Sequence, residues 1–82
     1  MTERDLQQKL LGFIQTEKQA GGEAFMGVSL ASLADAMAMD AAALRAQIGA
    51  LKRVDCIRYA EEDRDGNPVK VTITITGANR LK

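Results

Sequence analysis

The basic side chains that could bind phosphate are concentrated between residues 41 and 58. This segment contains one acidic residue, Asp55, and four basic ones, which are Arg45, Lys52, Arg53 and Arg58. Guanidinium and ammonium groups bind phosphate oxygens, and arginine also matches the two acceptors on the edge of guanine. Lys70 could join them from a later segment. The same cations would also be expected on a helix face that is merely solvated, so both interpretations stay open.

Side chains suited to catalysis or metal binding are scarce. The chain has no histidine and a single cysteine, Cys56, which excludes histidine-based acid–base catalysis, intrachain disulfides and cysteine-rich metal sites. The hydroxyls of Ser29 and Ser32 have no partner base and are typical of a helix start. The acidic stretch 61–65 lacks the ligand spacing of a calcium loop. We therefore predict no enzyme, no catalytic residue, no metal and no cofactor, with Cys56 a small buried hydrophobe.

Length and composition predict a single small domain, residues 1–82. Eleven basic and eleven acidic residues give a formal net charge of zero, and 46% of the residues are hydrophobic, which is typical of a globular protein. The N-terminus is polar and no apolar run approaches the roughly 18 residues of a membrane span, so no signal peptide and no membrane contact are expected. A lone cysteine fits a reducing cytoplasm.

Hydrophobic residues recur at helical spacing in three segments. The helices that they predict must position the basic side chains of residues 41–58. The first helix covers about residues 2–19, is ended by Gly21-Gly22, and has its apolar stripe at Leu6, Leu10, Phe13 and Ile14. Residues 29–54 predict two more helices joined by a tight turn at Met39-Asp40. Ser29 and Asp40 are the expected N-caps.

From residue 57 the hydrophobic period changes to two. Ile57 and Tyr59 alternate with polar residues, and the stretch 69–76 alternates more strictly still. The turn sequence Asp65-Gly66-Asn67-Pro68 lies between them, which predicts an antiparallel hairpin over about residues 57–76 and a short tail from Ala78. A third short strand is allowed at residues 25–28. The predicted core consists of Leu6, Leu10, Phe13, Ile14, Leu33, Met37, Leu44, Ile48, Leu51, Ile57, Val71 and Ile73.

From Val28 to Lys82 these residues resemble a known family, the winged helix-turn-helix domains of small bacterial transcription regulators. The matching segments are Leu30-x-x-Leu33-Ala34-x-x-Met37, Met39-Asp40, Leu44-x-x-x-Ile48-x-x-Leu51, Ile57-Arg58-Tyr59, Asp65-Gly66-Asn67, Val71-Thr72-Ile73-Thr74 and Thr76-Gly77-Ala78-Asn79-Arg80. The resemblance covers about two thirds of the chain. It implies an α+β fold with three helices packed on a small antiparallel β-hairpin, the wing. It also implies DNA binding in transcription regulation, with the helix 41–54 in the major groove.

Three features depart from the family pattern. Asp55 stands where glycine is usual between the recognition helix and the wing, and aspartate tolerates a left-handed conformation better than most residues. The expected recognition face is smooth, with few hydrogen-bonding side chains. The wing stretch 61–65 carries three net negative charges and would repel a phosphate backbone unless it points away.

The predicted partner is double-stranded DNA, and a homodimer through the first helix would help a weak site. The best candidate dimer contact is Leu11, which lies outside the main apolar stripe. The alternative is a protein-docking module without nucleic-acid binding, because the small face around Ala46 and Gly49 would let another chain approach closely. The candidate DNA-binding residues are Ala42, Arg45, Ala46, Gly49, Lys52, Arg53, Arg58 and Lys70.

Overall fold

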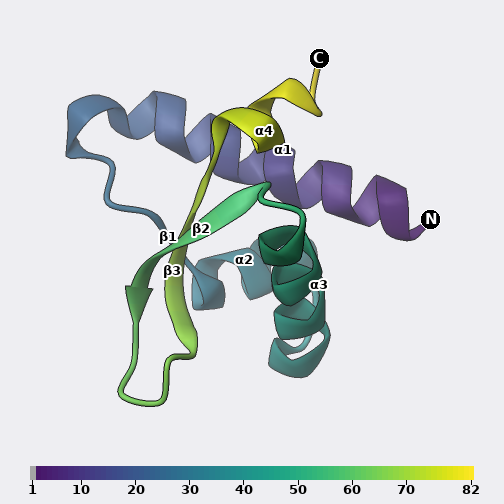
Figure 1. Ribbon diagram of the computed structural model, residues 1–82, viewed down its shortest axis with the longest axis vertical. Helices are drawn as coiled ribbons and strands as arrows, with labels where there is room; N and C mark the ends of the chain where they lie inside the picture. Colours follow the sequence, from purple (N-terminus) through teal and green to yellow (C-terminus); the bar gives the residue numbers. More distant parts are fainter. Residues whose placement is uncertain (1) are drawn as a thin grey trace.

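The computed structural model describes residues 2–82, which form four α-helices, one 3₁₀ turn and one three-stranded antiparallel sheet (Figure 1). The predicted α+β fold is confirmed. The optional third strand is present, but it lies at Val28–Ser29 and not over residues 25–28. In chain order the elements are α1 (Glu3–Gly21), η1 (Gly22–Ala24), β1 (Val28–Ser29), α2 (Leu30–Met37), α3 (Ala41–Arg53), β2 (Ile57–Glu62), β3 (Pro68–Ile73) and α4 (Ile75–Asn79).

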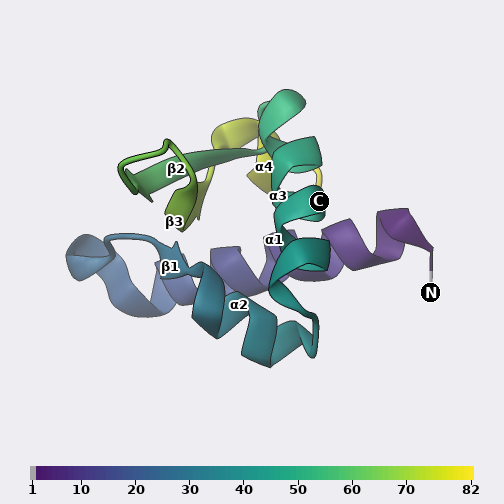
Figure 2. The same ribbon diagram turned by 90° about the horizontal axis from the view of Figure 1, so that it is seen from below.

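Local capping explains where the first three helices begin. The Thr2 hydroxyl accepts the N–H of Asp5, and the Asp5 carboxylate accepts the N–H of Thr2, which forms a capping box. Ser29 accepts the N–H of Ser32 and Asp40 accepts the N–H of Ala43, so both predicted caps are confirmed. These caps make the connection between α2 and α3 short, and the two helices cross at a steep angle (Figure 2).

The sheet has the order β1-β3-β2, so β3 is its central strand. Val28 pairs with Val71 across β1 and β3, while Ile57 pairs with Ile73 and Tyr59 with Val71 across β2 and β3. The register of β2 shifts immediately after Tyr59, where a bulge interrupts the ladder. The part of the hairpin before the bulge is therefore packed in the core. The part beyond the bulge, which carries the turn, bends away from the core.

The predicted end of the chain needs correction. We expected the last strand to reach residue 76 and to be followed by a tail, but β3 ends at Ile73 and residues 75–79 form α4. The Thr74 hydroxyl donates to the carbonyl of Asp55 at 2.6 Å and accepts the N–H of Gly77 at 3.1 Å, which caps the new helix. Ile75, predicted on the strand, is consequently 83% exposed.

The prediction that Leu11 lies outside the core is wrong. Its side chain is only 1% exposed, because α4 and the residues after it fold back along α1 (Figure 1). The Gln8 amide donates to the carbonyl of Arg80 at 3.0 Å and fixes this contact. The buried stripe of α1 is therefore wider than one row of side chains, and Leu11 cannot be the dimer contact.

Most of the predicted core is confirmed, with changes at its margin. Cys56 is completely buried, as expected for a small hydrophobe. Leu6, Phe13 and Met37 are half-buried rather than central. The fully or nearly fully buried apolar residues are Leu10, Leu11, Ile14, Val28, Leu33, Leu44, Ile48, Leu51, Cys56, Ile57, Val71 and Ile73.

Among residues 2–82, two residues other than glycine have left-handed backbone conformations. Asp55 has φ of 62°, as predicted for the turn between α3 and β2, and Ala38 has φ of 53° at the end of α2. Asp55 can tolerate this conformation, whereas the alanine Cβ crowds its own backbone there.

Replacing Ala38 by glycine should stabilise the fold by about 0.5 to 1 kcal/mol, because the relief of left-handed strain exceeds the entropy that glycine adds to the unfolded chain. Urea unfolding would measure this as a higher midpoint at an unchanged slope. A midpoint equal to or below that of the original chain would contradict the expectation.

Candidate nucleic-acid interface

Helix α3 buries one face and exposes the other, as its sequence predicts. Leu44, Ile48 and Leu51 are at most 1% exposed and point into the core. Among the candidate residues on its outer face and flank, Gly49 is half-buried, and the exposed ones are Ala42, Arg45, Ala46, Lys52 and Arg53. Six of the eight candidate DNA-binding residues therefore lie on the outer face or the flank of one helix.

Both flanks of α3 are held by neighbouring elements. On one flank the Gln7 amide of α1 donates to the side-chain carbonyl of Gln47 at 3.2 Å. On the other flank the ammonium nitrogen of Lys52 lies 4.9 Å from the ring centroid of Tyr59 in β2. Gln47 is thus part of the helix margin, and the outer face of α3 remains uncovered between α1 and the hairpin.

The tip of the hairpin projects on the same side of the molecule as the first turns of α3, away from α1 (Figure 1). Arg45 of α3 and Pro68 of β3 line one groove near the turn end of the hairpin. Because Glu62 pairs with Pro68, an acidic strand end lies beside this part of α3. The wing and the candidate recognition helix therefore belong to one surface.

The acidic turn of the wing is ordered by one of its own carboxylates. The Asp63 carboxylate turns back into the loop and accepts the N–H groups of Asp65 and Asn67, each at 2.9 Å. The Asn67 N–H lowers the pKa of the Asp63 carboxyl below its ordinary value of 3.8, and the Asp65 N–H and the Arg45 guanidinium lower it further. Glu61 lies opposite Lys70 in the backbone ladder. Because a lowered pKa keeps the Asp63 carboxylate ionised, the negative charge expected at the tip remains, and its hydrogen bonds order the turn.

Acid should loosen this turn. Since the folded pKa of Asp63 is lower than the unfolded one, its stabilising contribution is present above the unfolded pKa and is lost as the pH falls through the folded pKa. We expect the amide resonances of Asp65 and Asn67 to move together below about pH 4. The variant Asp63→Asn, which keeps the acceptor oxygen, should show no such titration, and equal titration in both proteins would exclude Asp63 as the cause.

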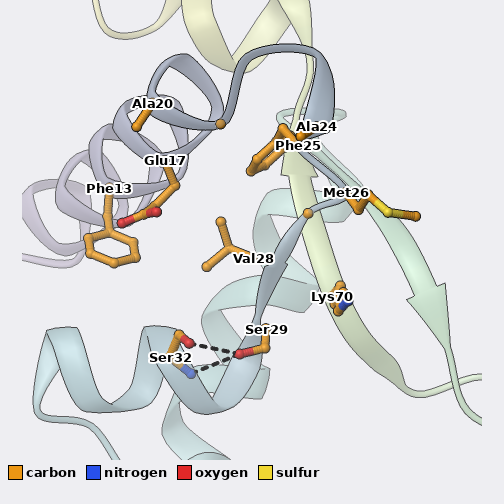
Figure 3. A pocket seen from close by; sticks show the side chains of 12 residues that line it. Phe13, Glu17, Ala20, Ala24, Phe25, Met26, Val28, Ser29, Ser32 and Lys70 are labelled. Atoms are coloured by element: carbon orange, nitrogen blue, oxygen red, sulfur yellow. Dashed lines mark hydrogen bonds between the residues drawn. The ribbon is translucent and has the colours of Figure 1, made fainter.

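The remaining two candidate residues lie elsewhere. Arg58 alternates with Ile57 and Tyr59 on β2, so it points to the sheet face opposite Lys52, where it lines a groove with Lys18 and Thr72. Lys70 lines another groove, between the end of α1, β1 and the start of α2 (Figure 3). The structure thus brings the α3 cations together and leaves Arg58 and Lys70 on separate surfaces.

One basic residue on the surface formed by α3 and the wing was not among the candidates predicted from the sequence. Arg64 is exposed in the turn between Asp63 and Asn67, at the tip of the hairpin. In the sequence, Arg64 enters only the net charge of the acidic stretch 61–65. Its central position in a turn sequence is the signal that could have found it.

No protein-family model and no curated protein matches the sequence. Solved structures do match the fold. A mutant of S. aureus MepR superposes with a TM-score of 0.73 over 99% of this chain and 53% of its own, at 17% identity. A second MepR mutant, bound to an oligodeoxyribonucleotide, superposes with a TM-score of 0.72 over 93% of this chain and 51% of its own, also at 17% identity. The chain has a winged-helix fold.

This winged helix spans about half the length of the MepR chains it matches. The likeness extends over α1 as well as the helix-turn-helix and the wing, because 99% of the present chain is covered. Within residues 2–82, no helix is both long and apolar enough to cross a membrane.

Proposed function

We propose that this winged helix binds double-stranded DNA, with α3 in the major groove, and acts in transcription regulation. The observation that carries the proposal is the uncovered face of α3, which has Arg45 and Arg53 exposed, with the hairpin tip projecting on the same side of the molecule. A helix of this diameter fits the major groove, and arginine can contact phosphate or guanine there. The MepR structure bound to an oligodeoxyribonucleotide supports the same use of the fold.

The proposed contacts are on α3 and at the wing tip. Arg45 and Arg53 bind phosphate or guanine, and Arg64 adds a contact from the wing. Ala42, Ala46 and Gly49 provide a smooth surface that can approach the bases closely. Three cationic contacts predict a salt slope near −2.7, from about −0.9 for each neutralised phosphate.

Few contacts also predict weak binding by one copy of the chain. A second copy would double the contacts, but Leu11 is buried and is not available to join them. A homodimer through α1 would therefore have to use the polar exposed side of this helix. Cytoplasmic location in a bacterium remains a prediction from the sequence.

Titration of a fluorescent random-sequence duplex tests the proposal. We expect saturable binding at low salt that weakens steeply as salt is added. Absence of binding at tens of micromolar protein at low salt would favour the alternative, a protein-docking module. The observation that favours this alternative is the exposed small face formed by Ala42 and Ala46.

A further inference from the structure

Lys52 and Arg53 are adjacent cations on α3, but they have different surroundings. Successive residues of a helix point about 100° apart, so one of the two can face the hairpin while the other faces outward. The Lys52 ammonium lies 4.9 Å from the ring centroid of Tyr59, within the range of a cation–π contact. Arg53 is exposed and lies on the outer side of α3 with Ala42 and Ala46.

The ring that receives Lys52 is itself held in place. Tyr59 is half-buried against the core and pairs with Val71, which is completely buried in the central strand. An ammonium group over such a ring contacts a rigid surface, whereas a phosphate contact would require it to leave this position. The lysine stem also spans the gap between α3 and β2.

Tyr59 occupies a particular place in the hairpin. It is the last residue of β2 in regular register, and the bulge follows between Tyr59 and Glu61. A bulge bends its strand, so the direction of the distal hairpin depends on how firmly the residue before it is fixed. The contact from Lys52 therefore acts at the point where the wing leaves the core.

We propose that Lys52 is a positioning residue that holds the wing beside α3 through the Tyr59 ring, and that it is not one of the phosphate contacts. The consequence for DNA rests on the proposed function. A winged helix that uses both α3 and the hairpin tip needs a fixed distance between them, so loosening the Lys52–Tyr59 contact weakens binding without removing a phosphate contact.

Salt dependence distinguishes positioning from direct contact. We expect Lys52→Met and Tyr59→Leu each to weaken duplex binding about two- to five-fold, the range of an exposed cation–π contact, with an unchanged salt slope. The double variant should bind no more weakly than either single variant. Tyr59→Phe keeps the ring and should bind like the original chain. Arg53→Met should instead reduce the magnitude of the slope by about 0.9. A loss of about 0.9 in slope for Lys52→Met, with normal binding by Tyr59→Leu, would overturn the proposal.

A measurement without DNA keeps this proposal separate from the proposed function. Protons on the Lys52 ε-carbon should resonate upfield in the original chain and in Tyr59→Phe, because they lie over an aromatic ring, and should return to ordinary positions in Tyr59→Leu. Lys52→Met, a surface change, should also increase backbone motion in residues 60–67. If no duplex is bound but both NMR effects are seen, the positioning role stands and the proposed function fails. Unshifted ε-protons in the original chain would overturn the positioning role whether or not DNA binds.

Discussion

A single methyl group at Gly77 should lower the free energy of unfolding by about 3 kcal/mol. A Cβ at this position would collide with the backbone carbonyl oxygen of Cys56 and would lie 2.8 Å from Cγ1 of Ile73. Both obstacles are firm, because one is backbone and the other belongs to a residue that is only 3% exposed. The collision can be relieved only by moving α4 away from the turn that follows α3.

This effect is large for so short a chain, whose total stability is expected to be about 4 to 12 kcal/mol. Thermal unfolding of Gly77→Ala should show a midpoint lowered by about 15 °C. Gly12→Ala is a matched control, since a Cβ there meets no atom within 4 Å and α1 should gain about 0.5 to 1 kcal/mol from the better helix former. Equal midpoints for Gly77→Ala and the original chain would show that α4 is not packed as described.

The elements that the sequence predicts well are those whose ends are decided locally. Ser29 and Asp40 bond to backbone groups three residues away, so both caps can be predicted from neighbouring residues alone. The orientation of α3 follows in the same way from Leu44, Ile48 and Leu51, whose spacing leaves only one face to bury.

The end of the last strand was not predicted, because its local pattern favours a longer strand. The alternating pattern continues through Ile75, and it outweighed the one local signal of a helix start, the N-cap residue Thr74. What ends the strand is the Thr74 hydroxyl on the carbonyl of Asp55, together with the close approach of Gly77 to Cys56. Both contacts join residues about twenty positions apart. The spacing of hydrophobic residues along the sequence carries no information about contacts at such separations. The burial of Leu11 was missed for the same reason, because it depends on α4.

The candidate site was predictable to a similar extent. Grouping Arg45, Lys52 and Arg53 on one helix needs only helical geometry. Their different surroundings depend on the hairpin, because Tyr59 receives Lys52 and the turn carboxylate of Asp63 lies within the electrostatic influence of Arg45. Arg58 lies on another surface because neighbouring residues of a strand point to opposite faces of the sheet. The alternation of Ile57 and Tyr59 along β2 could have predicted this.

Removing Arg45 and Arg53 together should abolish most of the duplex affinity. Each arginine that contacts a guanine edge contributes about 1 to 3 kcal/mol, so the double alanine variant should bind at least about tenfold more weakly at low salt. If both residues neutralise phosphates, the magnitude of the salt slope should fall by about 1.8. Fluorescence anisotropy over a series of salt concentrations measures the affinity and the slope together.

The control for this variant must remove the same net charge from another surface. Lys9 and Lys18 are exposed on α1, outside the α3 surface, and Lys9→Ala/Lys18→Ala changes the net charge equally. A protein attracted to DNA only by its overall charge would lose affinity to the same extent in both double variants. A protein that places α3 in the groove should lose affinity mainly in the variant without Arg45 and Arg53. The reason is that release of condensed ions requires close contact with phosphates. Similar losses in the two variants would therefore exclude α3 as the recognition helix, even if the original chain binds DNA.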